Sequence, residues 1–275
     1  MDLGLEGRVA LVAGGSSGIG LAVATELARE GAHVAIGARD RDRLELAARG
    51  LEAVAGGKVS ARSVDITDRA ASQRWVDDVA AEFGALHIVV ISGGSPPVGS
   101  AAQFEFDDYQ AAIEKILYPV VGLTLAALPY LKTAGWGRLL FVASETALVP
   151  IGPLVMSGVT RAPIVRFAQG LAADVGTGGI TVNVLAPGSI RTPMMERAAA
   201  KLAGGRDVEE QLAAMGHHSA LGRLARTDEI GAVGAFLASA RASFITGGVH
   251  LIDGGASVVG PNLPHVSGAT NSTYA

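Results

Sequence analysis

The chain has 275 residues, of which 49% are hydrophobic and 17% are charged, whereas globular proteins average about 25% charged residues. This composition predicts a large buried core and excludes intrinsic disorder for most of the chain, while the net charge of −4 offers no basic surface for nucleic acid or an anionic membrane. The absence of cysteine excludes disulfides, thiolate catalysis and cysteine-based metal sites, and it fits a cytoplasmic protein.

Short apolar runs alternate along the chain with longer segments of helical periodicity. The expected strands are 8–13, 32–37, 58–64, 86–91, 137–143, 180–185 and 249–253. The expected helices are 19–30, 40–55, 69–83, 107–132, 161–175, 194–203, 207–215 and 227–239. Several strands are unbroken runs of Val, Ile and Leu, which indicates burial on both faces, and their alternation with helices predicts parallel βαβ units.

This pattern predicts the α/β class, with a single doubly wound, Rossmann-type domain and a seven-stranded parallel sheet. The domain is expected to cover residues 1–260. Residues 261–275 are uncharged and rich in small polar residues, so we expect a C-terminal tail that is loose or docked on a neighbour.

The sequence shows no targeting or membrane segment. The first residues lack a basic region followed by an apolar stretch, so no signal peptide is predicted. Residues 116–131 are uncharged, but the stretch is shorter than the roughly 20 residues that span a bilayer. We therefore expect a soluble protein with neither a membrane nor a nucleic-acid partner.

A glycine-rich turn, Gly14-Gly-Ser-Ser-Gly18-Ile-Gly20, joins the first expected strand to the first expected helix. Glycines let the backbone approach a pyrophosphate, and a helix N-terminus offers free N–H groups and a partial positive charge. A tight strand-to-helix turn also needs glycine for its geometry, so the turn alone is a weak indication of a nucleotide site.

Three further features agree with a nucleotide site. Arg39 ends the second strand, where an arginine suits the 2′-phosphate of NADP(H), although it is also simply a solvated residue before a helix capped by Asp40. Asp65 and Ile66 follow the third strand, where they would line the adenine, while Thr67 or Asp68 caps the next helix. Ser92-Gly-Gly94 follows the fourth strand and permits close packing on a ribose, or forms an ordinary loop.

From about residue 5 to residue 255 the sequence resembles a short-chain dehydrogenase/reductase. The resemblance rests on the glycine-rich turn, Asp65, Gly93-Gly94, Ser144, Asn183-Val-Leu-Ala-Pro-Gly188 with Thr192, and Thr246-Gly-Gly with Asp253-Gly-Gly255. It implies that Pro187 to Ile190 and Thr192 contact the nicotinamide and diphosphate. It also implies a homotetramer or homodimer, joined through the helices near 107–132 and 161–175 and through the last strand. The predicted NADP(H)-binding residues are Gly14, Ser16, Ser17, Gly18, Ile19, Gly20, Arg39, Asp65, Ile66, Ser92, Gly93, Gly94, Arg161, Pro187, Gly188, Ile190 and Thr192.

The sequence departs from the family at the catalytic residues. The family uses a serine, a tyrosine, a lysine four residues later and an asparagine on a preceding helix. Ser144 matches the serine, but the tyrosine position is Ser157, the lysine position is Arg161, and the asparagine position falls near Lys115 or Ile116. An alkyl hydroxyl does not readily exchange a proton at pH 7 without a partner base, and arginine stays charged. Arg161 remains suited to ribose or diphosphate oxygens.

Pro163 predicts that the helix carrying Arg161 begins near Thr160, because proline is tolerated in a first turn and disrupts a helix interior. Such a start would spoil the one-turn alignment of Ser157 with Arg161.

Substitute proton donors each have a structural alternative. Tyr118 lies near the missing asparagine, or is a packed aromatic. Glu145 follows Ser144 directly, and is an acid/base in the substrate site or a solvent-facing carboxylate. His217 and His218 fall in the segment that usually covers the substrate, or on a loop surface.

Met194 and Met195 follow the Pro-Gly…Thr motif and would supply apolar walls to a substrate pocket, or pack in the core. The sequence shows no metal-binding motif.

The leading hypothesis is an NADP(H)-dependent oxidoreductase of the ketone reductase or alcohol dehydrogenase type, with a non-standard active site and a small apolar substrate. The alternatives are a non-redox enzyme on the same scaffold, such as a cyclase, isomerase or lyase, and an inactive nucleotide-binding sensor or subunit.

Overall fold

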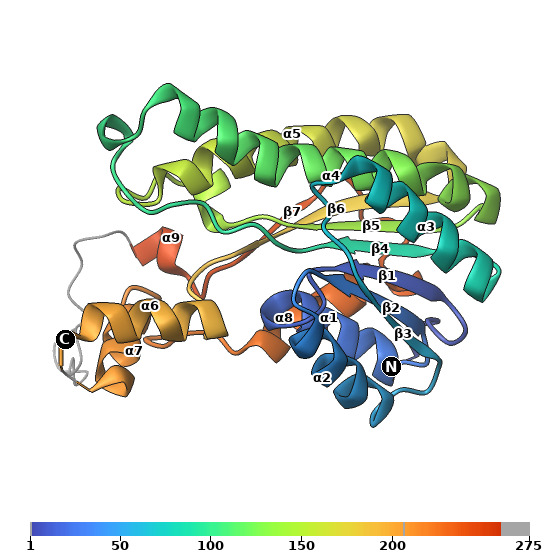
Figure 1. Cartoon of the computed structure of the whole chain (residues 1–275), viewed down its shortest axis with the longest axis horizontal. Helices are drawn as coiled ribbons and strands as arrows, with labels where there is room; N and C mark the ends of the chain where they lie inside the picture. Colours follow the sequence, from blue (N-terminus) through green and yellow to red (C-terminus); the bar gives the residue numbers. More distant parts are fainter. Residues whose placement is uncertain (1, 206, 260–275) are drawn as a thin grey trace, which may run out of the picture.

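The computed structural model describes residues 2–205 and 207–259. Within them the seven predicted strands pair in parallel, in the order β3-β2-β1-β4-β5-β6-β7 (Figure 1). Their bounds are β1 Val9–Ala13, β2 His33–Ala38, β3 Val59–Ser63, β4 Ile88–Ile91, β5 Gly137–Val142, β6 Ile180–Pro187 and β7 Val249–Ile252. The predicted fold class is thus confirmed. The predicted tail at 261–275 lies outside the described residues.

Helices cover both faces of the sheet (Figure 1). The α3, α4 and α5 helices lie on one face and the α1, α2 and α8 helices on the other, while α6 and α7 project beyond the carboxyl ends of the strands. The helices are α1 Gly18–Arg29, α2 Arg41–Glu52, α3 Arg69–Phe83, α4 Phe106–Ala134, α5 Val155–Val175, α6 Pro193–Ala203, α7 Val208–Gly216, α8 Thr227–Leu237 and α9 Ala256–Val259. Short 3₁₀ turns are η1 Ala101–Gln103, η2 Glu145–Ala147, η3 Gly176–Gly178 and η4 Ala240–Ala242.

The unbroken apolar strands supply two cores at once because successive side chains of a strand point to opposite faces. On β4, Val89 packs with the α3–α5 layer and Val90 with the α1, α2 and α8 layer. Both side chains are fully buried. The low charge of the chain is therefore explained by a sheet that has no solvent-exposed face over its central strands.

The α5 helix begins at Val155, so the predicted start near Thr160 is wrong. Pro163 lies inside the helix and leaves the carbonyl of Val159 without its usual N–H partner. Val159 is 38% exposed, so water can take this bond. One turn of helix therefore still separates Ser157 from Arg161.

The α4 helix is the one helix of the described chain that is long and apolar enough to cross a membrane by length and composition. Ile116, Leu123 and Leu131 on one side of it are buried in the core beside the sheet. Residues 116–131 are thus part of a core helix, while Leu125 on the other side remains half exposed.

The strand order places β1 and β4 at the point where the chain reverses its winding direction. In open α/β sheets, ligands bind outside the carboxyl ends of the strands at this point. The glycine-rich turn after β1 and the Ser92-Gly-Gly94 segment after β4 both lie there.

Candidate active site

The glycine-rich turn packs directly on the end of β4. A Cβ on Gly14, whose φ is +75°, would lie 1.8 Å from the carbonyl oxygen of Ser92, and one on Gly20 would lie 2.4 Å from the carbonyl of Gly14. Close backbone packing therefore requires both glycines, which agrees with the alternative that the turn needs glycine for its geometry. The same packing leaves the helix N-terminus usable, because the N-cap Ser17 makes no side-chain capping bond to the first turn of α1.

Segments far apart in the sequence meet at this turn. A Cβ on Gly18 would lie 3.6 Å from the methyl group of Thr192, so the segment after β6 lies against the start of α1. Thr192 also caps α6 by accepting the N–H of Met195 at 3.2 Å. Ser16, Ser17, Gly18 and Ile19 are partly buried beside it. The first and last parts of the predicted cofactor site are therefore brought together.

Arg39 and Asp40 have separate roles at the end of β2. The Asp40 carboxylate accepts the N–H of Arg43 at 3.1 Å and its Nε at 2.6 Å, and these bonds hold the pKa of Asp40 below its ordinary value. Arg39 is exposed, and its guanidinium forms no ion pair within the described residues. The acidic residue is thus used to cap α2, and Arg39 is left exposed at the end of β2 with no ion pair among the described residues.

Asp65 lies across from Arg39, at the end of β3. It accepts the backbone N–H of Thr67 at 3.0 Å and the Thr67 hydroxyl at 2.9 Å, which together with the Arg39 charge lower its pKa. Asp68 caps α3, so the cap and the adenine-side position are filled by different residues. Ile66 is partly buried against the core.

Arg161 is the most buried cation of the site. Its Nη1 donates to the carbonyl of Val142 at 2.9 Å, and its Nη2 donates to the carbonyls of Gly93 at 3.1 Å and Gly94 at 2.6 Å. Its Nε has no partner within the described residues. Burial lowers the pKa of Arg161 to about 10, so it remains charged at neutral pH. The guanidinium therefore joins the ends of β4 and β5 rather than activating a neighbouring hydroxyl.

The two candidate serines do not contact each other. Ser157 shares a 2.8 Å hydrogen bond with the hydroxyl of Thr146, whereas Ser144 accepts the backbone N–H of Thr146 at 3.2 Å. Ser144 and Ser157 are both partly buried. Thr146 thus lies between them and was not singled out by the sequence, in which a threonine two residues after the serine carries no motif.

Glu145 lies against Gly188. A Cβ on Gly188 would lie 3.1 Å from Oε2 of Glu145 and 2.9 Å from the Cα of Asp253. Burial, and to a smaller extent the charge of Asp253, raise the pKa of Glu145 to about 7. Glu145 is therefore not the solvent-facing carboxylate of the structural alternative. It is a partly protonated acid next to Ser144 at neutral pH.

The remaining predicted residues divide between the site and the surface. Met194 is 52% exposed, and the hydroxyl of Ser95, from the loop after β4, donates to its sulfur at 3.3 Å. Ser95 and Met194 thus join the β4 loop to α6 across the mouth of the site. His217 is exposed at the end of α7, which agrees with the alternative that it lies on a loop surface. Met195 is partly buried.

The side chain of Tyr118 is exposed, whereas that of Ile190 is buried. Tyr118 is 60% exposed and lies two positions, about 200° of helix rotation, from Ile116, which packs on Gly94. Tyr118 and Ile116 therefore lie on different sides of α4, which argues against Tyr118 as a proton donor. The side chain of Ile190 is buried in the core and its backbone pairs with Ala225, so a cofactor contact at this residue would be made by its backbone.

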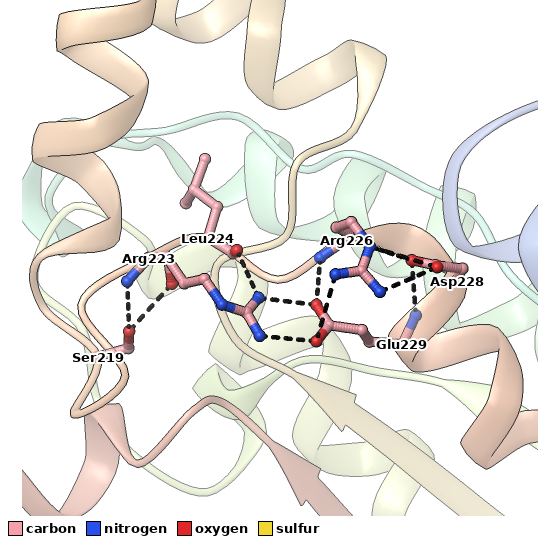
Figure 2. A network of polar contacts seen from close by, with 6 residues as sticks. All are labelled: Ser219, Arg223, Leu224, Arg226, Asp228 and Glu229. Carbon is pink, nitrogen blue, oxygen red and sulfur yellow. Dashed lines mark hydrogen bonds and ion pairs between the residues drawn. The ribbon is translucent and has the colours of Figure 1, made fainter.

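An ion-pair network not identified from the sequence fastens the segment between α7 and α8 (Figure 2). Arg223 donates two hydrogen bonds to Glu229, at 2.8 and 2.7 Å, and Glu229 also accepts the backbone N–H of Arg226 at 2.7 Å. Backbone bonds of Ala225 with Ser189 and Arg191 tie the same segment to the chain after β6. In the sequence, the only sign of this network is the acidic first turn of the helix expected at 227, and that pattern predicts a helix cap rather than a network.

Comparison with known proteins gives the class of this fold and site. A family model described as enoyl-(acyl carrier protein) reductase matches residues 13–257. D-threitol dehydrogenase of Mycolicibacterium smegmatis is 33% identical over 263 residues, covering 94% of this chain and 95% of the relative. A tropinone reductase homologue of Arabidopsis thaliana is 32% identical over 257 residues, 93% of this chain and 92% of the relative.

A solved structure agrees with these relatives. The crystal structure of L-sorbose reductase from Gluconobacter frateurii, complexed with NADPH and L-sorbose, has a TM-score of 0.88 and 32% identity, covering 93% of this chain and 98% of that one. The chain therefore belongs to the short-chain dehydrogenase/reductase family, a family of oxidoreductases.

Proposed function

We propose that the chain is an NADP(H)-dependent oxidoreductase of the ketone reductase or alcohol dehydrogenase type, with a non-standard active site and a small apolar substrate. The observation that carries the cofactor part is the pair at the end of β2, where Asp40 caps α2 and the Arg39 guanidinium forms no ion pair with any residue that the structure describes. Such a pair favours a 2′-phosphate over a free ribose hydroxyl, because a carboxylate aimed at that position would repel the phosphate.

The residues at the carboxyl edge fit NADP(H). The uncapped first turn of α1 would hold the diphosphate, and Arg39 the 2′-phosphate. Gly93 has open space where a Cβ would stand, and the buried Nε of Arg161 has no partner among the residues described, so this region would offer room and a donor to the nicotinamide ribose. When bound, NADPH supplies a hydride to the substrate carbonyl. Ser144 would orient that carbonyl by a hydrogen bond.

The substrate part of the proposal rests on Met194 and Met195. Both follow the Thr192 cap, and Met194 reaches the loop after β4 through Ser95. Thioether side chains at the mouth favour an apolar ligand. The names of the relatives include a polyol dehydrogenase and a sugar reductase, so polyhydroxylated ketones are the natural competing class.

Titration of the protein with NADPH and NADH, followed by fluorescence, tests the cofactor part. Arg39→Ala is expected to weaken NADPH binding about 10- to 100-fold, the equivalent of about 1.5–3 kcal/mol for hydrogen bonds to a charged group, and to leave NADH binding unchanged. Arg29→Ala, at the opposite end of α1, is the matched control and should change neither. Equal affinity for the two cofactors in the wild type would contradict the proposal.

Turnover tests the reaction part. Wild-type protein with NADPH is expected to reduce cyclic and aliphatic ketones with higher kcat/KM than ketoses. Higher kcat/KM on ketoses would refute the apolar substrate class alone. Tight NADPH binding with no turnover of either class would replace the oxidoreductase by the non-redox enzyme or the inactive nucleotide-binding subunit.

The assembly and location are proposed separately. We propose a cytoplasmic homodimer or homotetramer joined through α4, α5 and β7, because Leu125, Val159 and Leu251 are large apolar side chains exposed on those three elements. Sedimentation equilibrium should give a dimer or tetramer, and charged substitutions at Leu125 and Val159 should give a monomer. A monomeric wild type would exclude this assembly.

A further inference from the structure

We propose that Glu145 is the acid that protonates the substrate oxygen at this site, where Ser157 stands in the place of the family's tyrosine. The inference rests on the proposed oxidoreductase function and deepens it. It assigns to one side chain the step that Ser157, Arg161 and Tyr118 cannot perform.

The position of the carboxyl is the first argument. Glu145 is the first residue of η2 and directly follows Ser144 at the carboxyl end of β5. Its Oε2 lies 3.1 Å from the point where a Cβ on Gly188 would stand, so the carboxyl lies along the carboxyl edge of the sheet, between the ends of β5 and β6. Gly188 provides the space for it. A hydroxyl that orients the carbonyl and an acid that protonates it are thus consecutive residues.

The exclusion of other donors is the second argument. The Ser157 hydroxyl is engaged by Thr146, and Arg161 donates to three backbone carbonyls. Tyr118 is 60% exposed and lies about 200° around α4 from Ile116, and His217 is exposed at the end of α7. Of the candidate groups, Glu145 combines partial burial with a place next to Ser144.

The surroundings of Glu145 favour its protonated form. Asp253, at the end of β7, accepts the N–H groups of Gly255 at 2.9 Å and Ser257 at 2.8 Å, and these bonds hold its own pKa low. Pro187 and Gly188 at the end of β6 carry no charge, and Arg161 of α5 is held by carbonyls. The ionised Asp253 is therefore the charged group that faces Glu145, and it adds to the effect of burial in raising the pKa of Glu145 to about 7.

The proton balance of the step is simple. As hydride reaches the carbonyl carbon, the π electron pair of the C=O bond moves to oxygen. This oxygen takes the carboxyl proton of Glu145, whose O–H bond breaks to leave the carboxylate. A proton from water then restores the acid. A pKa near the working pH suits both halves of this cycle.

Glu145→Gln is the test, because glutamine keeps the shape of the side chain and cannot donate an acidic proton. We expect kcat for ketone reduction to fall about 100- to 10,000-fold, with the NADPH Kd within twofold of the wild type. Glu82→Gln, on the exposed side of α3, is the matched control and should leave kcat unchanged.

A second readout needs no turnover. In carboxyl-labelled protein without cofactor, the ¹³C NMR signal that Glu145→Gln removes should titrate near pH 7, and Asp253→Asn should move its midpoint to lower pH. The alkaline limb of the kcat/KM profile should move by the same amount. A midpoint near the ordinary value for glutamate, or full activity of Glu145→Gln, would overturn the assignment.

The failure of this inference is distinguishable from failure of the proposed function. If the wild type turns over ketones and Glu145→Gln does so equally fast, only the role of Glu145 is refuted. A wild type that binds NADPH and reduces no ketone refutes both.

Discussion

Nη2 of Arg161 lies 2.6 Å from the carbonyl oxygen of Gly94, so a side chain of α5 holds the loop that follows β4. The same guanidinium also binds the carbonyls of Gly93 and Val142, and no carboxylate pairs with it among the described residues. The fork of an arginine can bridge two strand ends, which the single ammonium group of a lysine does less well. Arg161 therefore has a structural role at the position where the family has its catalytic lysine.

Truncating this cation should destabilise the fold. Arg161→Ala removes the donor of the buried Val142 carbonyl and of the part-buried carbonyls of Gly93 and Gly94, and it opens a cavity, so we expect a loss of about 3–5 kcal/mol in the free energy of unfolding. Arg166→Ala, on the exposed side of the same helix, should change it by less than about 0.5 kcal/mol. Urea unfolding followed by circular dichroism measures both, and equal midpoints for the two variants would exclude the structural role of Arg161.

Gly188 should tolerate no side chain. Gly188→Ala places a methyl group 2.9 Å from Asp253 and 3.1 Å from Glu145, so we expect a loss of about 1–3 kcal/mol and lower ketone turnover as the carboxyl is displaced. Gly170→Ala is the control within a helix, since nothing lies within 4 Å of its new methyl group. It should stabilise the protein by about 0.5–1 kcal/mol. Thermal unfolding that ranks the two variants in the opposite order would contradict this packing.

The sequence predicted the strands well because a buried parallel strand has a clear signature. For six apolar runs, the predicted ends lie within two residues of the observed strand ends. The exposed edge strand β3 was predicted as closely, because of its place in the alternation of strands and helices. The start of α5 was predicted wrongly because the rule for Pro163 is local. The burial of Thr160 and Arg161 on the inner side of that helix outweighs one lost hydrogen bond.

The cofactor half of the site was more predictable than the catalytic half. The predictions for Gly14, Gly18 and Arg39 depend on backbone shape and charge, which a motif records. The roles of Arg161 and Glu145 depend on partners far along the chain, Gly94 and Asp253, which no spacing indicates. Tyr118 was a candidate only because it lies near the family's asparagine position in the sequence. Its place on α4, about 200° around the helix from Ile116, argues against it.

The network in Figure 2 should make stability depend on acid pH. Hydrogen bonds from Arg223 and from the backbone of Arg226 lower the pKa of Glu229 to about 2, from 4.5. Between these values the native state binds fewer protons than the unfolded state, so the stabilisation is present above pH 4.5 and is lost as the pH falls towards 2. Glu229→Gln should flatten this part of the stability curve, and the exposed Glu52→Gln should not. An identical slope in Glu229→Gln and wild type would contradict the pairing. Because the pair is exposed, 1 M salt should also reduce the slope.

The missing tyrosine should be replaceable, because α5 keeps positions 157 and 161 one turn apart. In a Glu145→Gln background, adding Ser157→Tyr and Arg161→Lys is expected to raise kcat at least tenfold, since a phenol activated by a neighbouring lysine is then available. The single change Ser157→Tyr should restore less, because the guanidinium of Arg161 remains bound to Val142, Gly93 and Gly94. Single-turnover reduction of a ketone by bound NADPH measures the proton-dependent step directly. Rescue governed by a single pKa that is higher than the one in the wild-type rate profile would show that the phenol replaces Glu145 as the acid for the same substrate oxygen. A folded triple variant with intact NADPH binding and no rescue would show instead that Thr146 and Arg161 have reshaped the pocket around Ser157, so that a phenol there no longer reaches the substrate.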